Sequence, residues 1–206
     1  MNAYDKMYLE DAMQVAGAMF DCAVNSFSCP AEEFCTRFLS SGIAERFSYG
    51  DVSIIAGKSG SELAREVLRL SGSQVAGCGG IVSMSSPEYW AGWALAYYQW
   101  KSGLTFKQLS VLGLDMFRVL PMFNPLHEAD LSVFCTHADG IVADAMGSSP
   151  QWVKRLRRLN GFTQERLSEI TGVPIRLIRA YEQKTIDPAN AESRTVNNLR
   201  RGLNLQ

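Results

Sequence analysis

The cationic side chains of this 206-residue chain gather towards its C-terminal end. Residues 150–206 hold eleven lysines and arginines against five acidic residues, a net charge of +6, whereas residues 1–149 carry a net charge of −7. Lysine and arginine neutralise phosphates, and the counterions that they release drive association with nucleic acid. Because a basic surface is often only solvated, the residue pattern must decide whether this stretch binds nucleic acid.

Histidine and carboxylate side chains gather at one further place. His127, Glu128 and Asp130 lie close together, and His137 follows ten residues after the first histidine. At about 100° per residue, His127 and Asp130 share one side of a helix while Glu128 points elsewhere. Zinc takes four ligands, or three and a water, so two candidates fall short of a site. We expect a hydrogen-bonded histidine at a helix start and predict no metal ligand.

The remaining chemical motifs are incomplete. A phosphate-binding loop that ends in the GKSG run at 57–60 requires glycine at position 52, which is Val52, so Lys58 is interpreted as a surface turn residue. No serine-nucleophile motif or paired-carboxylate arrangement stands out. The sequence therefore predicts no cofactor, no catalytic residue and no enzyme, although an enzyme with a DNA-binding tail is retained as a minor alternative.

The cysteines are odd in number and contain no C-x-x-C pair, which argues against a disulfide framework and against a zinc site. They are Cys22, Cys29, Cys35, Cys78 and Cys135. We expect reduced thiols in or near a core. No secretory signal is recognisable, and the most apolar segment, Trp90–Trp100, is far shorter than the ~20 residues of a membrane span. A cytoplasmic protein without membrane contact is therefore expected.

Helical periodicity dominates the first 147 residues. Apolar residues recur at helical spacing over 5–27 and 61–70, and Pro30 opens a short helix that ends before Gly42. Ser86-Pro87 starts a helix that ends at Gly103, and Asn124-Pro125 starts another that runs to about Met146. Residues 51–60 are predicted as a turn or extended piece. Residues 71–85 are predicted as a loop, within which Ile81, Val82 and Met84 alternate as in one short strand.

The helix from residue 87 carries four aromatic residues on one stripe. Trp90, Trp93, Tyr97 and Trp100 lie at i, i+3, i+7 and i+10. Such a stripe is far more often part of the core than part of a ligand site. We therefore predict a core contact, and a ligand pocket beside this helix is kept as the alternative.

Residues 149–206 contain signals for four short helices. Ser149-Pro150 starts the first, Gly161 ends it, and Thr163 is placed to cap a second helix over 164–171 that ends at Gly172. A third helix runs to about Glu182, and Asp187-Pro188 starts the last. The predicted inward-facing residues are Val153, Leu156, Leu159, Leu167, Ile170, Leu177, Ile178, Tyr181, Val196, Leu199 and Leu203. Two short helices joined by a tight glycine turn indicate a helix-turn-helix.

This stretch resembles the Cro/repressor-type, or XRE-like, helix-turn-helix family. The resemblance rests on L-x-x-L-x-G-F-T-Q-x-x-L-S-x-x-x-G-V from Leu156 to Val173 and on I-x-x-Y-E-Q from Ile178 to Gln183. It implies that the third helix lies in the major groove of duplex DNA. The DNA-contacting residues that it implies are Thr163, Gln164, Ile175, Arg176, Arg179, Lys184 and Thr185.

The resemblance also assigns roles within that set. Gln164 would hold a phosphate or steady the reading helix, and Lys184 and Thr185 would lie near phosphates. Ile175, Arg176 and Arg179 would face base edges or adjacent backbone, since arginine suits guanine and isoleucine can touch a thymine methyl. Arg157 should pair with Glu182 and tie the first helix to the third. Pro174 departs from the family, which has a capping serine or threonine there, so the start of the reading helix is left open.

The N-terminal region is similar to that of small bacterial helix-turn-helix proteins. The similar segments are Tyr8–Met13, Gly57–Leu63, Tyr89–Trp100 and His127–Asp130. Such proteins are often encoded beside toxin-like genes, so the resemblance implies an antitoxin whose N-terminal domain binds a toxin-like protein partner or a second copy.

Together these observations predict an all-α chain of two domains. Residues 1–147 would form an acidic partner-binding or dimerisation domain, and residues 148–206 a basic helix-turn-helix domain of four to five helices. The expected function is a transcriptional regulator, an antitoxin-like autorepressor that acts as a homodimer on an inverted repeat of double-stranded DNA. The alternative is a small-molecule-responsive repressor with a ligand pocket in the N-terminal domain.

Overall fold

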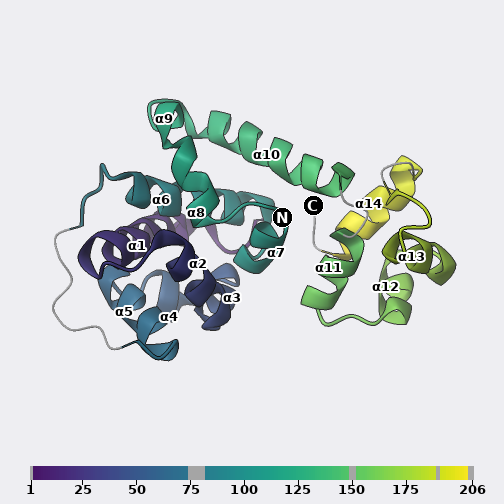
Figure 1. Ribbon diagram of the computed structural model, residues 1–206, viewed down its shortest axis with the longest axis horizontal. Coiled ribbons are helices and arrows are strands. Elements are labelled where there is room, and N and C mark those ends of the chain that lie inside the picture. The colour runs from purple at the N-terminus through teal and green to yellow at the C-terminus, as the bar shows by residue number, and fades with distance from the viewer. Residues whose placement is uncertain (1, 74–81, 149–151, 189–190, 204–206) are drawn as a thin grey trace.

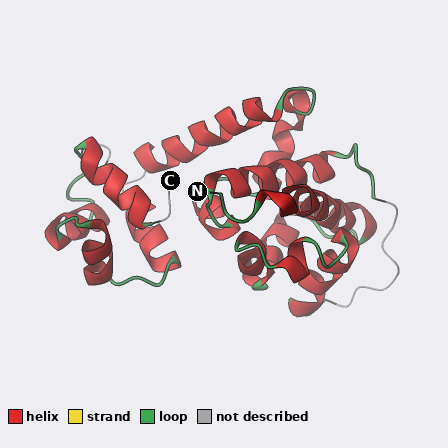
Figure 2. Ribbon diagram, turned by 180° about the vertical axis from the view of Figure 1, so that it is seen from behind, coloured by secondary structure: helices red, strands yellow, loops and turns green. Residues whose placement is uncertain are grey.

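The computed structural model describes residues 2–73, 82–148, 152–188 and 191–203. Every regular element within these ranges is a helix, and none of them contains a β-strand (Figure 2). The predicted all-α fold is confirmed. Of the segment that alternates like a strand, Ile81 lies outside the described residues, and Val82 and Met84 form no strand.

The first half of the chain gathers into one group of helices in which α1 packs along α6 and α5 (Figure 1). Its helical segments are η1 (Lys6–Tyr8), α1 (Leu9–Asp21), the π-helical turn η2 (Cys22–Ser26), α2 (Ala31–Ser40), α3 (Ile43–Ser48), α4 (Val52–Ile55), α5 (Gly60–Leu70), α6 (Pro87–Ser102), α7 (Phe106–Val111), α8 (Met116–Val119), η3 (Leu120–Met122) and α9 (Phe123–Leu126).

Helices α1 and α6 approach each other closely because small residues line their contact. A Cβ atom placed on Gly92 would lie 2.5 Å from the Ala16 carbonyl oxygen, and one on Gly17 would lie 2.9 Å from the Tyr89 carbonyl oxygen. Real Cβ atoms do not tolerate such distances, so glycine is required at both positions. This contact forms the centre of the N-terminal core.

The helix α6 begins and ends where the sequence predicts. The Ser86 hydroxyl accepts a hydrogen bond from the Tyr89 amide at 3.0 Å, and Gly103 takes the left-handed conformation after the last turn. Among the predicted stripe, Trp90 and Trp100 are buried, and the other two aromatics are partly buried against the same core. The prediction of a core contact is therefore confirmed.

Two predictions of secondary structure in residues 1–148 are wrong. The turn predicted over 51–60 contains the short helix α4, because the Asp51 carboxylate accepts from the Ser53 amide at 3.0 Å and Ile54 and Ile55 are buried. The helix predicted from Asn124-Pro125 does not run on to Met146. The backbone at Asn124 is not helical, α9 ends at Leu126, and α10 (Leu131–Ser148) begins only after Asp130.

The four cysteines that the structure describes, Cys22, Cys29, Cys35 and Cys135, are buried free thiols, as expected. Burial raises the pKa of each thiol, and the pKa of Cys35 reaches about 12. Cys78 lies outside the described residues. None of the helices described is long and apolar enough to cross a membrane.

The C-terminal helices form a second group, and α10 runs towards them from the first (Figure 1). They are α11 (Trp152–Leu159), α12 (Gln164–Thr171), α13 (Ile175–Glu182) and α14 (Ser193–Gly202). Helix α11 packs against α7 of the first group, and the buried apolar residues of both groups belong to one contiguous cluster. The division into two domains at residues 147 and 148 therefore stays a prediction.

Candidate nucleic-acid interface

Helices α12 and α13 follow each other across a three-residue turn. The Thr163 hydroxyl caps α12 by accepting from the Arg166 amide at 3.0 Å, and Gly172 ends the helix in the left-handed conformation. Val173 is buried in the turn, where its carbonyl accepts from the Ser168 hydroxyl at 2.7 Å. The bounds of α12 are those predicted from sequence.

Proline is tolerated directly before α13. Pro174 caps the helix with no side-chain hydrogen bond, and its carbonyl accepts from the amides of Leu177 and Ile178. The helix therefore begins at Ile175, which settles the start that the sequence left open. Proline suits this place because its fixed φ is compatible with a helix start and it has no amide hydrogen to satisfy.

Fewer apolar residues of the four C-terminal helices face inward than the sequence predicts. Most of the expected apolar residues are buried or partly buried, but Leu159 is 37% exposed and Ile170 is 39% exposed. Trp152 of α11 is buried, although the sequence did not predict it as an inward-facing residue. The start signal at Ser149-Pro150 lies outside the described residues. Pro188 lies in 3-10 conformation, as a helical start there predicts, but the last α-helix, α14, begins only at Ser193.

A buried ion pair holds α11 against α13. The Arg157 guanidinium donates to both carboxylate oxygens of Glu182, at 2.6 and 2.8 Å, and also donates to the Phe162 carbonyl at 2.6 Å. The two side chains are only 11% and 3% exposed. This pair was predicted and is confirmed.

The same carboxylate reaches α12, because the Gln164 side-chain amide donates to Glu182 Oε2 at 2.8 Å. Burial by itself would raise the pKa of the Glu182 carboxyl, but the hydrogen bonds from Arg157 and Gln164 outweigh it and hold that pKa below its ordinary value. The hydrogen bonds to Glu182 also raise the pKa of Arg157. Of the two roles expected for Gln164, these contacts favour the structural one, in which it steadies α13.

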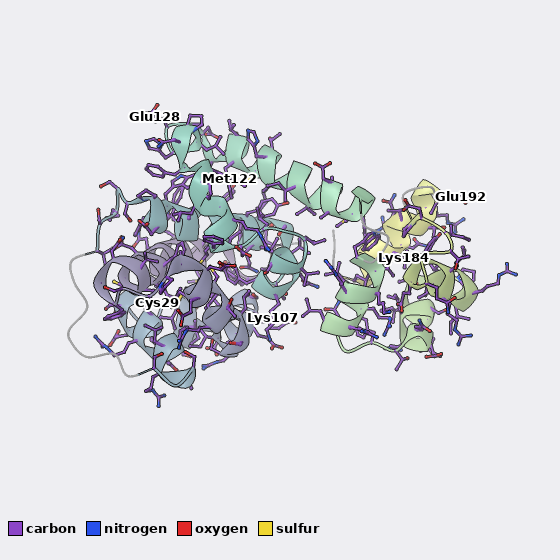
Figure 3. All side chains as sticks on the ribbon, viewed as in Figure 1. Cys29, Lys107, Met122, Glu128, Lys184 and Glu192 are labelled. Carbon is purple, nitrogen blue, oxygen red and sulfur yellow. The ribbon has the colours of Figure 1, made fainter. Side chains whose placement is uncertain are left out.

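Helix α13 turns one face inward and one outward. Ile178 and Tyr181 are buried, Ile175 is partly buried, and Arg176 and Arg179 are exposed. Nitrogen-tipped side chains project outward from this group of helices (Figure 3). The positions expected to face DNA are therefore available to a partner.

Arg179 is exposed but not alone. Its guanidinium donates to Gln164 Oε1 at 3.4 Å and to Glu165 Oε1 at 3.3 Å, and both members of the Arg179–Glu165 ion pair are more than half exposed. Such a pair is weak in water, so a phosphate or base edge can compete for the arginine. The structure thus brings Gln164 and Arg179 together at the start of α12.

Lys184 and Thr185 follow the C-terminal end of α13. The amide of Lys184 donates to the Tyr181 carbonyl at 3.2 Å, and that of Thr185 donates to the Ala180 carbonyl at 3.0 Å. This is the Schellman pattern, and Lys184 takes its left-handed position with φ of 61°. Both side chains are exposed.

A polar contact joins this unit to the N-terminal helices. The buried Gln108 side chain on α7 donates to Asn160 Oδ1 at 3.2 Å and to the Leu203 carbonyl at 3.1 Å. Sequence reasoning missed this residue, as it missed Glu165, because the partner of each lies on another element and no local motif joins the two. Only the capping signal Thr105–Gln108 marks the glutamine, and it points to α7 alone.

The other candidate clusters are occupied by local contacts. The His127 ring lies at the end of α9 and not at a helix start, where it stacks on Phe123 and hydrogen-bonds its carbonyl at 2.9 Å. Lys58 pairs with Glu66 of α5. Among the described residues, no three histidine, cysteine or carboxylate side chains are grouped closely enough to hold a metal ion.

Comparisons of the chain with models of known protein families, with curated proteins and with solved structures found no match.

Proposed function

We propose that this protein is a DNA-binding transcriptional regulator and that α12 and α13 form its helix-turn-helix. The observation that carries the proposal is the arrangement of α13, whose inner face is anchored by Ile178 and Tyr181 while Arg176 and Arg179 stay exposed. A reading helix needs both properties, since it must be held rigidly while its outer side chains reach base edges.

The electrostatics support duplex DNA as the partner. The C-terminal stretch carries a net charge of +6, and its least exposed arginine–carboxylate pair, Arg157–Glu182, is already satisfied within the fold. The exposed cations Arg176 and Lys184 stay available for bases and phosphates. Phosphate contacts position a protein on the duplex, and base contacts specify the sequence.

The test compares two variants of the full-length chain on duplex DNA. We expect Arg176→Ala to lose sequence preference, at about 1–3 kcal/mol of discrimination, because it removes a base-edge contact. Lys184→Ala should weaken binding to every sequence about equally and lower the salt dependence. The readout is the affinity for selected and scrambled duplexes over a range of salt. Equal losses on all sequences for both variants would contradict the placement of α13 in the groove.

We further propose that the regulator is a homodimer on an inverted repeat. One module contacts few base pairs, and its non-specific affinity is only about 10⁻⁴–10⁻⁶ M at physiological salt, so a second copy supplies the missing contacts. Footprinting on the protein's own promoter should show two protected patches about one helical turn apart. One isolated patch from a monomeric protein would refute the dimer.

We also propose an antitoxin-like role, in which the N-terminal region binds a toxin-like protein partner. That region is acidic, with a net charge of −7 over residues 1–149, and so is suited to a protein partner more than to DNA. Co-purification with the product of the neighbouring gene is expected. Failure to bind that product, in a protein that still binds its promoter, would remove the antitoxin role and leave the regulator.

A further inference from the structure

A cavity of about 400 Å³ lies where α6, α10 and α14 come together. Helix α10 runs towards α14 beyond the end of α6 (Figure 1). Tyr98 and Lys101 on α6, Asp139 and Met146 on α10, and Arg200 on α14 all line the cavity. Its volume falls within the range of ~300–1,000 Å³ that is typical of small-molecule sites.

The charged side chains of the lining favour an anion. Lys101 and Arg200 carry positive charges, and Asp139 carries the single negative one. That carboxylate already accepts a hydrogen bond from the Tyr98 hydroxyl at 2.7 Å. Burial raises the pKa of Tyr98, and the hydrogen bond to Asp139 and its charge raise it further, so the hydroxyl keeps its proton and its role as donor.

Arg200 has a donor that the fold leaves unused. Its Nε atom is buried and has no hydrogen-bond partner among the described residues. The contrast with Arg157 is direct, because the Nε of that arginine donates to Glu182 at 2.6 Å. A buried donor without an acceptor costs about 1–3 kcal/mol. Because this Nε atom is closed to solvent, a ligand in the cavity meets Arg200 through the other atoms of its side chain, which line the cavity and bring the positive charge.

Apart from Ser102, the remaining lining residues are apolar. Leu104, Val142, Ala143 and Met146 line the same cavity, and Leu104 and Met146 are buried. A ligand that is only a small inorganic ion would leave these side chains without contact. The combination of two cations and a largely apolar remaining wall is that of a site for an anionic group on an apolar body.

We propose that this cavity binds a small organic anion, with the anionic group on Arg200 and Lys101 and the apolar body against Val142 and Met146. Such a ligand contacts α6 and α10 on one side and α14 on the other. Helix α14 packs against α12, so occupancy changes the free energy of the arrangement that presents α13. The binding site stands on its own geometry, and only the coupling to DNA rests on the proposed function.

The first experiment measures binding to the full-length protein. The probe is 8-anilinonaphthalene-1-sulfonate, an aromatic sulfonate whose fluorescence rises on burial, and its neutral analogue N-phenyl-1-naphthylamine is the matched control. We expect one saturable site for the sulfonate. We expect Arg200→Gln to weaken it at least about tenfold and to leave the affinity for the neutral analogue nearly unchanged, because a charge-assisted hydrogen bond is lost.

Two further variants test whether the sulfonate binds at the cavity and not elsewhere on the surface. Arg201→Gln removes the same charge from the neighbouring, exposed position of α14 and should leave sulfonate binding unchanged. Lys101→Gln, on the opposite wall, should weaken binding without touching α14. Thermal unfolding of each variant checks that it is folded. Absence of saturable binding, or equal binding by the native protein and Arg200→Gln, would overturn the site.

The second experiment measures duplex DNA affinity with and without the sulfonate. We expect a change of at least about fivefold in the native protein and none in Arg200→Gln. Sulfonate bound at Arg200 with unchanged DNA affinity would overturn the coupling. A protein that binds the sulfonate but no DNA would overturn the proposed function and leave the site standing.

Discussion

Two pairs of helices in this chain differ in how closely they pack and in how much charged surface they leave exposed. Helices α1 and α6 approach each other closely at Gly17 and Gly92, and most residues of both helices are buried. Helices α12 and α13 meet through a few apolar anchors, such as Leu167 and Ile178, and leave charged side chains exposed. The first pair stabilises the fold, whereas the second has surface left over for a partner. Substitutions in the two pairs should therefore fail in different ways.

The largest loss of stability is expected at the Arg157–Glu182 ion pair, which holds α13 against α11. Glu182→Ala leaves the Arg157 guanidinium in a nearly buried site without its carboxylate, which typically costs about 3–5 kcal/mol. Denaturant unfolding of the full-length protein measures the loss. Glu169→Ala is the matched control, because Glu169 forms an ion pair with Arg166 in which both side chains are at least 60% exposed, and it should change stability by less than about 0.5 kcal/mol.

The pH dependence of stability sharpens the same test. The pKa of Glu182 is lower in the folded protein than its ordinary value, so its contribution is fully present above that ordinary value, about 4.3, and is lost as the pH falls through the folded-state pKa. We expect Glu182→Gln to lose part of the acid sensitivity of unfolding. Equal acid sensitivity in the native protein and the variant would contradict the ion pair.

A smaller loss is expected where α1 and α6 touch. Gly92→Ala places a Cβ atom 2.5 Å from the Ala16 carbonyl oxygen and forces the helices apart, at a cost of about 1–3 kcal/mol. Gly140→Ala on α10 is the matched control, since nothing lies within 4 Å of its Cβ position, and it should gain about 0.5–1 kcal/mol from helix propensity. Thermal unfolding compares the two, and equal effects would contradict the close approach.

A loss of about 1–2 kcal/mol is expected at the contact between the two helix groups. Gln108→Ala removes the donor shared by the Asn160 side chain and the Leu203 carbonyl, both of which are then left without it. Gln14→Ala, at an exposed glutamine on α1, is the control and should be nearly neutral. Hydrogen exchange of α11 and α14 should speed up in the first variant, and unchanged exchange there would mean that this contact is not needed.

The sequence predicts what is local and misses what depends on distant partners. The cap at Thr163 and the glycine ends of α6 and α12 are confirmed. The Arg157–Glu182 pair, whose members lie 25 residues apart, is also confirmed, but it was expected from the family resemblance and not from a local signal. Helix α4 was missed because four residues are too few for a period to show. The cavity at Arg200 was missed because its walls come from helices about 40 to 100 residues apart, and no motif joins them.

The smallest effect separates stability from function at a single residue. Lys184 takes the left-handed conformation with φ of 61°, which glycine adopts without steric cost. Lys184→Gly should therefore raise the free energy of unfolding by about 0.5–1 kcal/mol. If the proposed function is right, it should also weaken DNA binding on every sequence, because the proposed phosphate contact is lost. Lys184→Ala removes the same charge but keeps the Cβ atom, so it should weaken DNA binding equally without the gain in stability.

The free energy of unfolding and the affinity for DNA, each measured on both variants, test this prediction. If the glycine variant were less stable than the alanine variant, the left-handed end of α13 would be wrong; if neither lost affinity for DNA, Lys184 would not belong to the interface.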